Sequence, residues 1–366
     1  MKVSILTPDV SHNCLARAWL LAEMLKARYD VEIVGPMFGI GVWEPLSGRD
    51  DIRIKAVRFG NGTRMRNQLK PLAGLADGDV VYASKLLFSS YVVGLYKKFF
   101  DHRPLLLDVD DWEMGFNYHG RNEKKWLDYA CEKLAFLADD VTVSNRFLQK
   151  KFGGTLVPHA RDGRVFDPTR YSKVEERREI GLPSSAKVVM FAGTPKQFKG
   201  VEDLIAAVGR LNDPGVCLAT VGMGADAYSK ELIEEGRATL GNRFQSFGIQ
   251  PFERFPAFLA AADVVVAPQR KNYATVGQVP SKVFDAMAMA KPLIVTNVSD
   301  LPEIVDGCGW VVEPENVPQL AETIGAALSR PDDALENGRK ARERFEKTYS
   351  YDVVQDALFR LFKKYE

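Results

Sequence analysis

The stretch richest in chemistry begins at Pro280-Ser281-Lys282 and continues through Asp285 and a run of small residues to Pro292. Ser281 is a favourable N-cap residue, so we expect a helix to start there with its first-turn amides facing an anion such as a pyrophosphate. Asp285 lies about one turn further on, where a carboxylate can accept hydrogen bonds from paired ribose hydroxyls. A purely structural interpretation, a capped helix with a solvated Asp285, is compatible with this one.

A second candidate is the turn from Gly193 to Gly200, which contains Lys196 and Lys199. Glycines allow a close approach of the backbone to phosphate, and the ammonium groups neutralise phosphate oxygens. The turn fits neither the GxGxxG nor the Walker pattern, so an ordinary NAD or ATP loop is disfavoured. Taken alone, it is equally well explained as a surface loop with solvated lysines.

Short β-branched runs alternate with helical stretches in both halves of the chain. The predicted strands cover residues 3–7, 31–34, 80–83, 105–108, 141–143, 187–192, 216–221, 264–267, 293–295 and 310–312. Buried strands separated by helices indicate parallel sheets, so we expect an α/β protein with two Rossmann-like, doubly wound domains and ligands beyond the carboxyl ends of the strands. The pattern breaks at residues 153–178, which predicts domains at 1–170 and 171–349 and a final helix at 350–366 that crosses back to the first domain.

Composition narrows the class of protein. A chain that is 46% hydrophobic and 27% charged, with a net charge of +1, is expected to be folded and soluble and has no global field for nucleic acid or anionic membranes. The four cysteines form no CxxC pair and no histidines stand at i, i+4, so we expect no disulfide framework and no metal site. The short apolar run after Met1 is too brief for a signal peptide, which indicates a cytoplasmic location.

Four ordered motifs in the second half closely resemble the donor-binding domain of retaining GT-B glycosyltransferases of family 4. The motifs are Gly193…Lys199-Gly200, Val221-Gly222-Met223-Gly224, Phe247-Gly248 before Leu259–Val264, and Pro280-Ser281-Lys282…Asp285-Ala286-Met287-Ala288…Pro292. The resemblance covers residues 187–330 and extends only loosely to the first half. It implies a GT-B fold, a nucleotide sugar as donor, an acceptor bound by the first domain, and no cofactor or metal.

The resemblance also suggests roles for single residues. Lys199 matches the pyrophosphate lysine and Asp285 the ribose-binding acid. Ser281 and Lys282 match the diphosphate-facing start of the motif helix, and Ile249 matches the residue whose backbone meets the base. The expected donor-binding set is Gly193, Thr194, Lys196, Lys199, Gly222, Ile249, Gly277, Gln278, Val279, Ser281, Lys282 and Asp285.

Two positions depart from the family pattern. Thr194 replaces an arginine, so Lys196 is expected to supply the second cation. Gly277 replaces a glutamate eight residues before Asp285, so contacts to the donor sugar are expected from backbone amides around Gly277, Gln278 and Val279.

In the first half, Asp108, Asp110 and Asp111 end the strand predicted at 105–108, where many family members carry a catalytic histidine. Asp110 or Asp111 could stabilise positive charge on the sugar ring or accept the proton of the acceptor hydroxyl. Two alternatives stay open: an arginine-paired or solvated strand end, and the DxD metal site of GT-A transferases, which Asp108-Val-Asp110 also spells.

Other first-half residues are candidates by position. Asn13, His119 and His159 are expected on the acceptor side or at the edge of the cleft. The stretch from Arg53 to Lys70 is a candidate for contact with anionic lipid headgroups at the inner face of the membrane, although a solvated face explains it as well. Its cations, with no acid between Ile52 and Ala76, are Arg53, Lys55, Arg58, Arg64, Arg66 and Lys70. Nucleic acid is not an expected partner, because aromatic residues are not interleaved there.

The sequence therefore predicts a retaining, metal-independent glycosyltransferase with Asp110, Asp111 and Lys199 as catalytic candidates. Its acceptor is a hydroxyl of a saccharide, a lipid-linked molecule or a small molecule. A nucleotide-sugar 2-epimerase of the same architecture, or a non-catalytic partner subunit, is the alternative.

Overall fold

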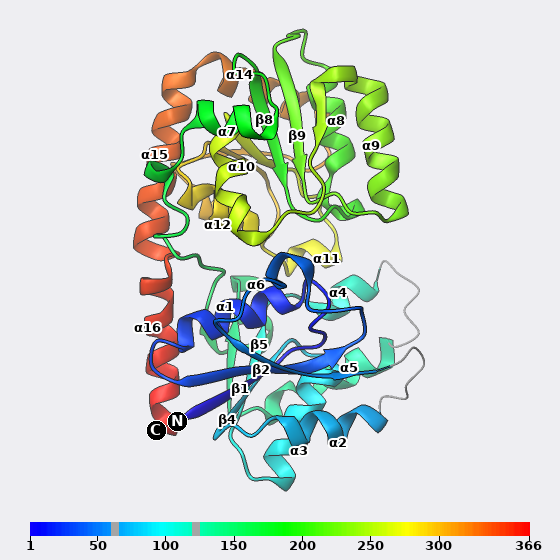
Figure 1. Cartoon of the computed structure of the whole chain (residues 1–366), viewed down its shortest axis with the longest axis vertical. Helices are drawn as coiled ribbons and strands as arrows, with labels where there is room; N and C mark the ends of the chain where they lie inside the picture. Colours follow the sequence, from blue (N-terminus) through cyan, green and yellow to red (C-terminus); the bar gives the residue numbers. More distant parts are fainter. Residues whose placement is uncertain (60–65, 119–124) are drawn as a thin grey trace. The chain divides into compact units, whose positions relative to one another are not determined.

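The computed structural model describes residues 1–59, 66–118 and 125–366, and the chain forms two compact units (Figure 1). The first unit consists of Met1–His159, Val276–Val279 and Tyr351–Glu366, and the second of Ala160–Thr275 and Pro280–Ser350. The short segment 276–279 and the C-terminal helix thus belong to the first unit although they follow most of the second in sequence. The boundary between the two units falls after His159, which lies within the predicted break at residues 153–178.

The first unit is built on a seven-stranded parallel sheet in the order β3-β2-β1-β4-β5-β6-β7. Its strands are β1 (Lys2–Leu6), β2 (Asp30–Met37), β3 (Arg53–Arg58), β4 (Val80–Ser84), β5 (Leu105–Val109), β6 (Asp140–Val143) and β7 (Thr155–Leu156). Its helices are α1 (Leu15–Leu25), α2 (Arg66–Leu75), α3 (Val93–Phe100), α4 (Glu113–Asn117), α5 (Lys125–Lys133), α6 (Arg146–Phe152) and α16 (Tyr351–Phe362). The sequence pattern missed β3 and β7, because the side chains of these edge strands are half-buried or exposed and so carry no continuous apolar run.

The C-terminal helix α16 packs beside α1 (Figure 1). Phe362 is fully buried and meets Tyr82 of β4 edge-on, with ring centroids 5.6 Å apart. The ring centroid of Tyr29, which precedes β2, is also 5.6 Å from that of Phe362. The Tyr29 hydroxyl donates a hydrogen bond of 2.7 Å to Oε1 of Glu366. Aromatic contacts of this kind add to the free energy of area burial, so α16 is an integral part of the first unit.

The second unit has a six-stranded parallel sheet in the order β10-β9-β8-β11-β12-β13. Its strands are β8 (Lys187–Ala192), β9 (Val216–Val221), β10 (Phe244–Ser246), β11 (Val264–Ala267), β12 (Leu293–Thr296) and β13 (Trp310–Val312). Its helices are α7 (Lys173–Ile180), α8 (Val201–Gly209), α9 (Ala227–Leu240), α10 (Phe255–Ala261), α11 (Tyr273–Val276), α12 (Ser281–Ala288), α13 (Leu301–Ile304), α14 (Val317–Ser329) and α15 (Pro331–Thr348).

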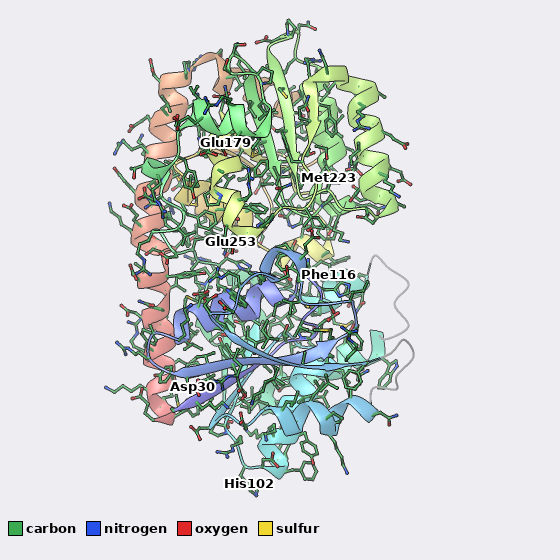
Figure 2. The ribbon with its side chains drawn as sticks, viewed as in Figure 1. Asp30, His102, Phe116, Glu179, Met223 and Glu253 are labelled. Carbon is green, nitrogen blue, oxygen red and sulfur yellow. The ribbon has the colours of Figure 1, made fainter. Side chains whose placement is uncertain are left out.

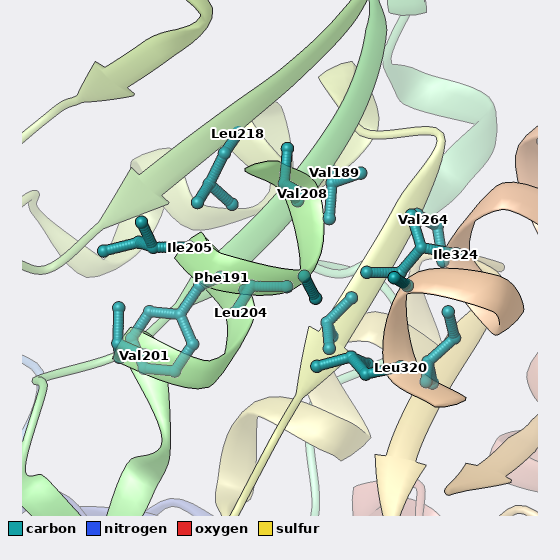
Figure 3. Packing of buried hydrophobic residues seen from close by; sticks show 14 of the residues in the cluster. Val189, Phe191, Val201, Leu204, Ile205, Val208, Leu218, Val264, Leu320 and Ile324 are labelled. Carbon is teal, nitrogen blue, oxygen red and sulfur yellow. The ribbon is translucent and has the colours of Figure 1, made fainter. Parts of the chain in front are cut away.

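One core of this unit lies between the sheet and helices α8 and α14 (Figure 3). Val189 and Val264 of the sheet are buried there with Leu204 of α8 and Ile324 of α14. Met223, which Figure 2 labels, lies in the turn after β9, is 3% exposed and belongs to this core. The two parallel sheets confirm the expected α/β class, since each unit repeats the strand order of a doubly wound fold.

Candidate functional site

In each sheet, one pair of neighbouring strands is followed by connections that wind in opposite directions. The strand orders place this switch point between β1 and β4 in the first unit and between β8 and β11 in the second. In doubly wound sheets, ligands bind beyond the carboxyl ends of the strands at such a point. Most of the predicted site residues lie in the loops that follow these strands.

The turns after β8, β9 and β10 contact one another at this edge of the second sheet. The Gly193 amide donates to the Val221 carbonyl over 2.8 Å, and the Gly222 amide donates to the Gly248 carbonyl over 2.6 Å. Gly222 has a φ of +105°, and a Cβ there would lie 2.6 Å from the Gly193 carbonyl oxygen, so only glycine permits this approach. Ile249, directly after Gly248, is 41% exposed and accessible to a ligand.

The lysine-containing turn also contacts the turn after β11. Gly200 has a φ of +65°, and a Cβ there would lie 2.1 Å from the Pro268 carbonyl oxygen. Lys199 is half-buried with its Nζ 5.3 Å from the Phe198 ring centroid, whereas Thr194 and Lys196 are exposed. The structure therefore brings Lys199 to the switch point of the second unit.

Helix α12 begins at Ser281, but Ser281 is not its N-cap. Pro280 occupies that position and provides no side-chain hydrogen bond, so the predicted serine cap is wrong. Proline takes the cap because its preferred φ, here −65°, suits the extended residue before a helix. The start of α12 lies beside the turn that follows β8, since a Cβ on Gly193 would lie 3.6 Å from Cγ of Lys282.

The interpretation of Asp285 as a solvated residue is also wrong. Asp285 is fully buried, its carboxylate contacts Nε of Arg161, and its other oxygen lies 3.2 Å from Nζ of Lys282. Burial lowers the pKa of Lys282 and Arg161 lowers it further, while Asp285 opposes both. The Lys282 ammonium also lies 3.9 Å from the Phe255 ring centroid, a cation–π contact. Asp285 is thus already paired with two cations, and its contact with ribose stays a prediction.

In the first unit, Lys85 is the centre of a buried acidic cluster. Its Nζ lies 2.7 Å from Asp110, 2.6 Å from Asp111 and 3.2 Å from Glu113. Lys85 follows β4 with a φ of +72°, and its amide donates to the Asp108 carbonyl over 2.8 Å. A non-glycine residue in the left-handed region is strained, so the surrounding contacts must hold this backbone.

The three acids of this cluster have different proton affinities. Burial raises the pKa of Glu113 to about 7, and burial raises the pKa of Asp110 to about 6 despite the attraction of Lys85. Burial acts in the same direction on Asp111, but Lys85, Gln278 and the charge of His159 together hold the pKa of Asp111 below its usual range. At neutral pH Asp111 therefore stays ionised. Glu113 and Asp110, with pKa values close to neutral pH, can each bind or release a proton there.

The segment 276–279 packs on this cluster. Nε2 of Gln278 donates to Oδ1 of Asp111 over 2.9 Å, and Nδ2 of Asn145 donates to the Gly277 carbonyl over 3.2 Å. A Cβ on Gly277 would lie 2.6 Å from Cβ of Trp112 and 3.3 Å from the ring of Phe147. The glycine at this position thus leaves room for Trp112, which follows the acidic pair directly.

Asp108 has a structural role. Its Oδ2 accepts from Nε of Arg17 over 2.9 Å, and its Oδ1 accepts from the second arm of Arg17 over 2.8 Å and from Thr142 over 2.7 Å. Arg17 is 2% exposed and also donates to the carbonyl oxygens of Val157 and Pro158. Both carboxylate oxygens of Asp108 accept hydrogen bonds from Arg17, and one also accepts from Thr142. The DxD interpretation of Asp108 and Asp110 is therefore not supported. Among the described residues, no group of three acids, histidines or cysteines is arranged to hold a metal ion.

The remaining candidates are spread over the first unit. His159 is half-buried and close enough to Asp111 to affect its pKa, and Val279 is buried. Asn13 is exposed just before α1. His119 lies outside the described residues. Sequence reasoning missed Lys85, Glu113 and Arg161, because each acts through partners distant in the chain.

Part of the basic stretch has acidic partners that are distant in sequence. Lys55 lies 2.9 Å from Glu32 and 3.0 Å from Asp77, and Arg53 lies 3.9 Å from Glu32. These cations are therefore not all available to a lipid surface. Arg64 lies outside the described residues. In the described part of the chain, no helix is long and apolar enough to cross a membrane.

A known protein family matches the second half of the chain. The family described as "Glycosyl transferases group 1" matches residues 186–330, which include the glycine turns, Lys199 and helix α12. This match is confined to the second half of the chain. The resemblance seen in the motifs is thereby confirmed.

Similar proteins agree with this assignment. The colanic acid biosynthesis glycosyl transferase WcaI of Escherichia coli K12 is 28% identical to this chain over 183 residues, which cover 49% of the chain and 43% of WcaI. The D-inositol 3-phosphate glycosyltransferase of Corynebacterium jeikeium is 24% identical over 221 residues, covering 57% of the chain and 51% of that enzyme. The chain thus spans about half the length of the curated relatives it matches.

Among solved structures, Anabaena HepE in complex with UDP-glucose superposes with a TM-score of 0.82 at 19% identity, with all of both chains covered. This likeness establishes the fold, and the chain is a GT-B protein as expected.

Proposed function

We propose that this protein is a glycosyltransferase that moves a sugar from a nucleoside diphosphate sugar to an acceptor hydroxyl, with retention at the anomeric carbon and without a metal ion. The carboxyl edge of the second sheet carries the proposal. There the Gly193 turn, Lys199 and the start of α12 gather within the segment that matches the family. Glycines, cations and helix amides together suit a diphosphate.

On the donor side, Lys199, Lys196 and the first-turn amides of α12 stabilise the departing diphosphate. Ile249 lies beside the base, and Asp285 is assigned to the ribose. UDP-sugars are the first donors to test, because HepE was solved with UDP-glucose, and GDP-sugars are the second.

On the acceptor side, Asp111 is the ionised carboxylate of the Lys85 cluster and stabilises positive charge that develops on the sugar ring. The leaving phosphate takes the proton of the acceptor hydroxyl, or Asp110 accepts it. The acceptor is a saccharide, a lipid-linked molecule or a small molecule. We place the reaction in the cytoplasm, since the four cysteines are all free, and exposed cations of residues 53–70 are candidates for contact with the membrane.

A thermal-shift screen against UDP, GDP, ADP and dTDP sugars tests the donor, because a ligand that binds the folded protein raises its apparent stability. We expect one nucleotide sugar to raise the melting temperature and to be consumed with a hydroxyl acceptor, in EDTA as well as without it. An absence of any shift would contradict the proposal. Formation of an isomeric nucleotide sugar without acceptor would identify an epimerase, and binding without turnover over a broad acceptor panel would identify a partner subunit.

A further inference from the structure

Gln269 has a buried side-chain amide without partners. It is 1% exposed, and among the residues that the structure describes neither its Nε2 nor its Oε1 has a hydrogen-bond partner. An unsatisfied buried polar group destabilises a fold, so such a residue in a native structure calls for an explanation. The side chain is neutral and is not placed by an ion pair.

The position of Gln269 is next to the candidate donor site. It follows β11, one of the two strands at the switch point of the second unit. Its carbonyl accepts a hydrogen bond of 2.6 Å from Thr296, and the next amide, of Arg270, donates to the Phe198 carbonyl over 2.9 Å. Phe198 directly precedes Lys199, so the backbone of Gln269 is fixed beside the lysine turn.

The alternation of side chains along β11 gives the face on which Gln269 lies. Val264 and Val266 are buried in the core with α8 and α14, as Figure 3 shows for Val264 beside Ile324. Arg270 lies on that same face, because it pairs with Asp203 of α8 at 2.7 Å. Gln269 therefore lies on the opposite face, the one that α12 contacts.

The chemistry of an unpaired amide selects the ligand group. A diphosphate only accepts hydrogen bonds, so it would satisfy Nε2 and leave Oε1 unpaired. A hydroxyl both donates and accepts, so neighbouring hydroxyls satisfy both atoms. We propose, on the basis of the proposed function, that Gln269 binds hydroxyl groups of the nucleotide sugar. The unpaired amide of the free protein becomes paired in the complex.

The test uses Gln269→Leu, which keeps the approximate size and removes the polar atoms. We expect its free energy of unfolding in urea to equal or exceed that of the wild type, because an unsatisfied amide is lost. We expect its affinity for the donor found in the thermal screen, UDP-glucose first, to fall at least tenfold. Gln319→Leu, at a residue of the second unit whose Oε1 accepts from the Glu313 amide over 2.8 Å, is the control with unchanged donor affinity.

Affinities for UDP and 2′,3′-dideoxy-UDP distinguish the source of the hydroxyls. A loss confined to UDP-glucose assigns the contact to the transferred sugar, and a loss that includes UDP but spares 2′,3′-dideoxy-UDP assigns it to ribose. An equal loss for all three ligands, or no loss, overturns the inference, and so does a destabilised Gln269→Leu variant. The stability arm needs no ligand, so a wild type that binds no nucleotide sugar would count against the proposed function separately.

Discussion

Gln278 donates a hydrogen bond of 2.9 Å to Asp111, although 167 residues separate them in the chain. The neighbouring Gly277 makes this approach possible, since a Cβ there would lie 2.6 Å from Cβ of Trp112. The glycine that departs from the family pattern is thus required by the packing of the first unit. Asp111 thus contacts Gln278 through one carboxylate oxygen and Lys85 through the other.

We expect Gly277→Ala to reduce activity at least tenfold, because the added methyl group forces the segment 276–279 away from Trp112 and stretches the Gln278–Asp111 hydrogen bond. Steady-state kinetics measure the loss. Gly48→Ala is the matched control, since in the described part of the chain no heavy atom lies within 4 Å of the Cβ it would add. Normal kinetics in Gly277→Ala would show that the contact with Trp112 has no role in the site.

Lys199→Ala is expected to lower kcat/KM by about 10²–10³, because the variant lacks the ammonium group that stabilises the departing diphosphate. We expect a much smaller effect on melting temperature, because Lys199 is half-buried and not part of the core. Lys230→Ala, at an exposed lysine of α9, controls for the loss of a surface cation. Full activity in Lys199→Ala would contradict the proposed donor site.

Arg161 and Asp285 form a buried ion pair within the second unit. We expect Arg161→Met to destabilise this unit by about 3–5 kcal/mol in urea unfolding, because the buried carboxylate loses the arginine and keeps Lys282 as an ion-pair partner. The double variant Arg161→Met/Asp285→Asn should recover much of that loss.

Arg164→Met is the control for the Arg161→Met variant, because Arg164 pairs with Asp162 at the surface and its side chain is 79% exposed. Its effect should stay below about 1 kcal/mol. A double variant as unstable as Arg161→Met would show that Arg161 stabilises the unit through contacts other than Asp285.

Glu113 gives stability a pH dependence with a defined sign. Burial raises its pKa from 4.5 to about 7, so between these values the folded state binds more protons than the unfolded state. Wild-type stability contributed by this group is full below about pH 4.5 and is lost as the pH rises through about 7. Relative to Glu113→Gln, the wild type should therefore lose about 2–3 kcal/mol between pH 5 and pH 8, as measured by urea unfolding. A constant difference between the two proteins over this range would show that Glu113 does not titrate there.

Local sequence pattern is sufficient to predict the fold class and the glycine turns at the carboxyl edge of the second sheet. Buried parallel strands such as Val216–Val221 appear as continuous apolar runs, and the glycine turns must stand at fixed offsets after their strands, so local pattern suffices to find them. Helix α12 was found from its local composition, but its cap was misassigned because Pro280 competes with Ser281 for that position.

Only the tertiary structure decided the partners of the charged residues. Lys85 meets Asp110 and Asp111, Arg161 meets Asp285, and Gln278 meets Asp111. No spacing in the sequence encodes these pairs, because each joins residues brought together by the winding of the sheets or by a segment that returns to the first unit. The physical reason is that burial and neighbouring charge, not residue type, set whether a carboxylate is ionised, neutral or bound in an ion pair.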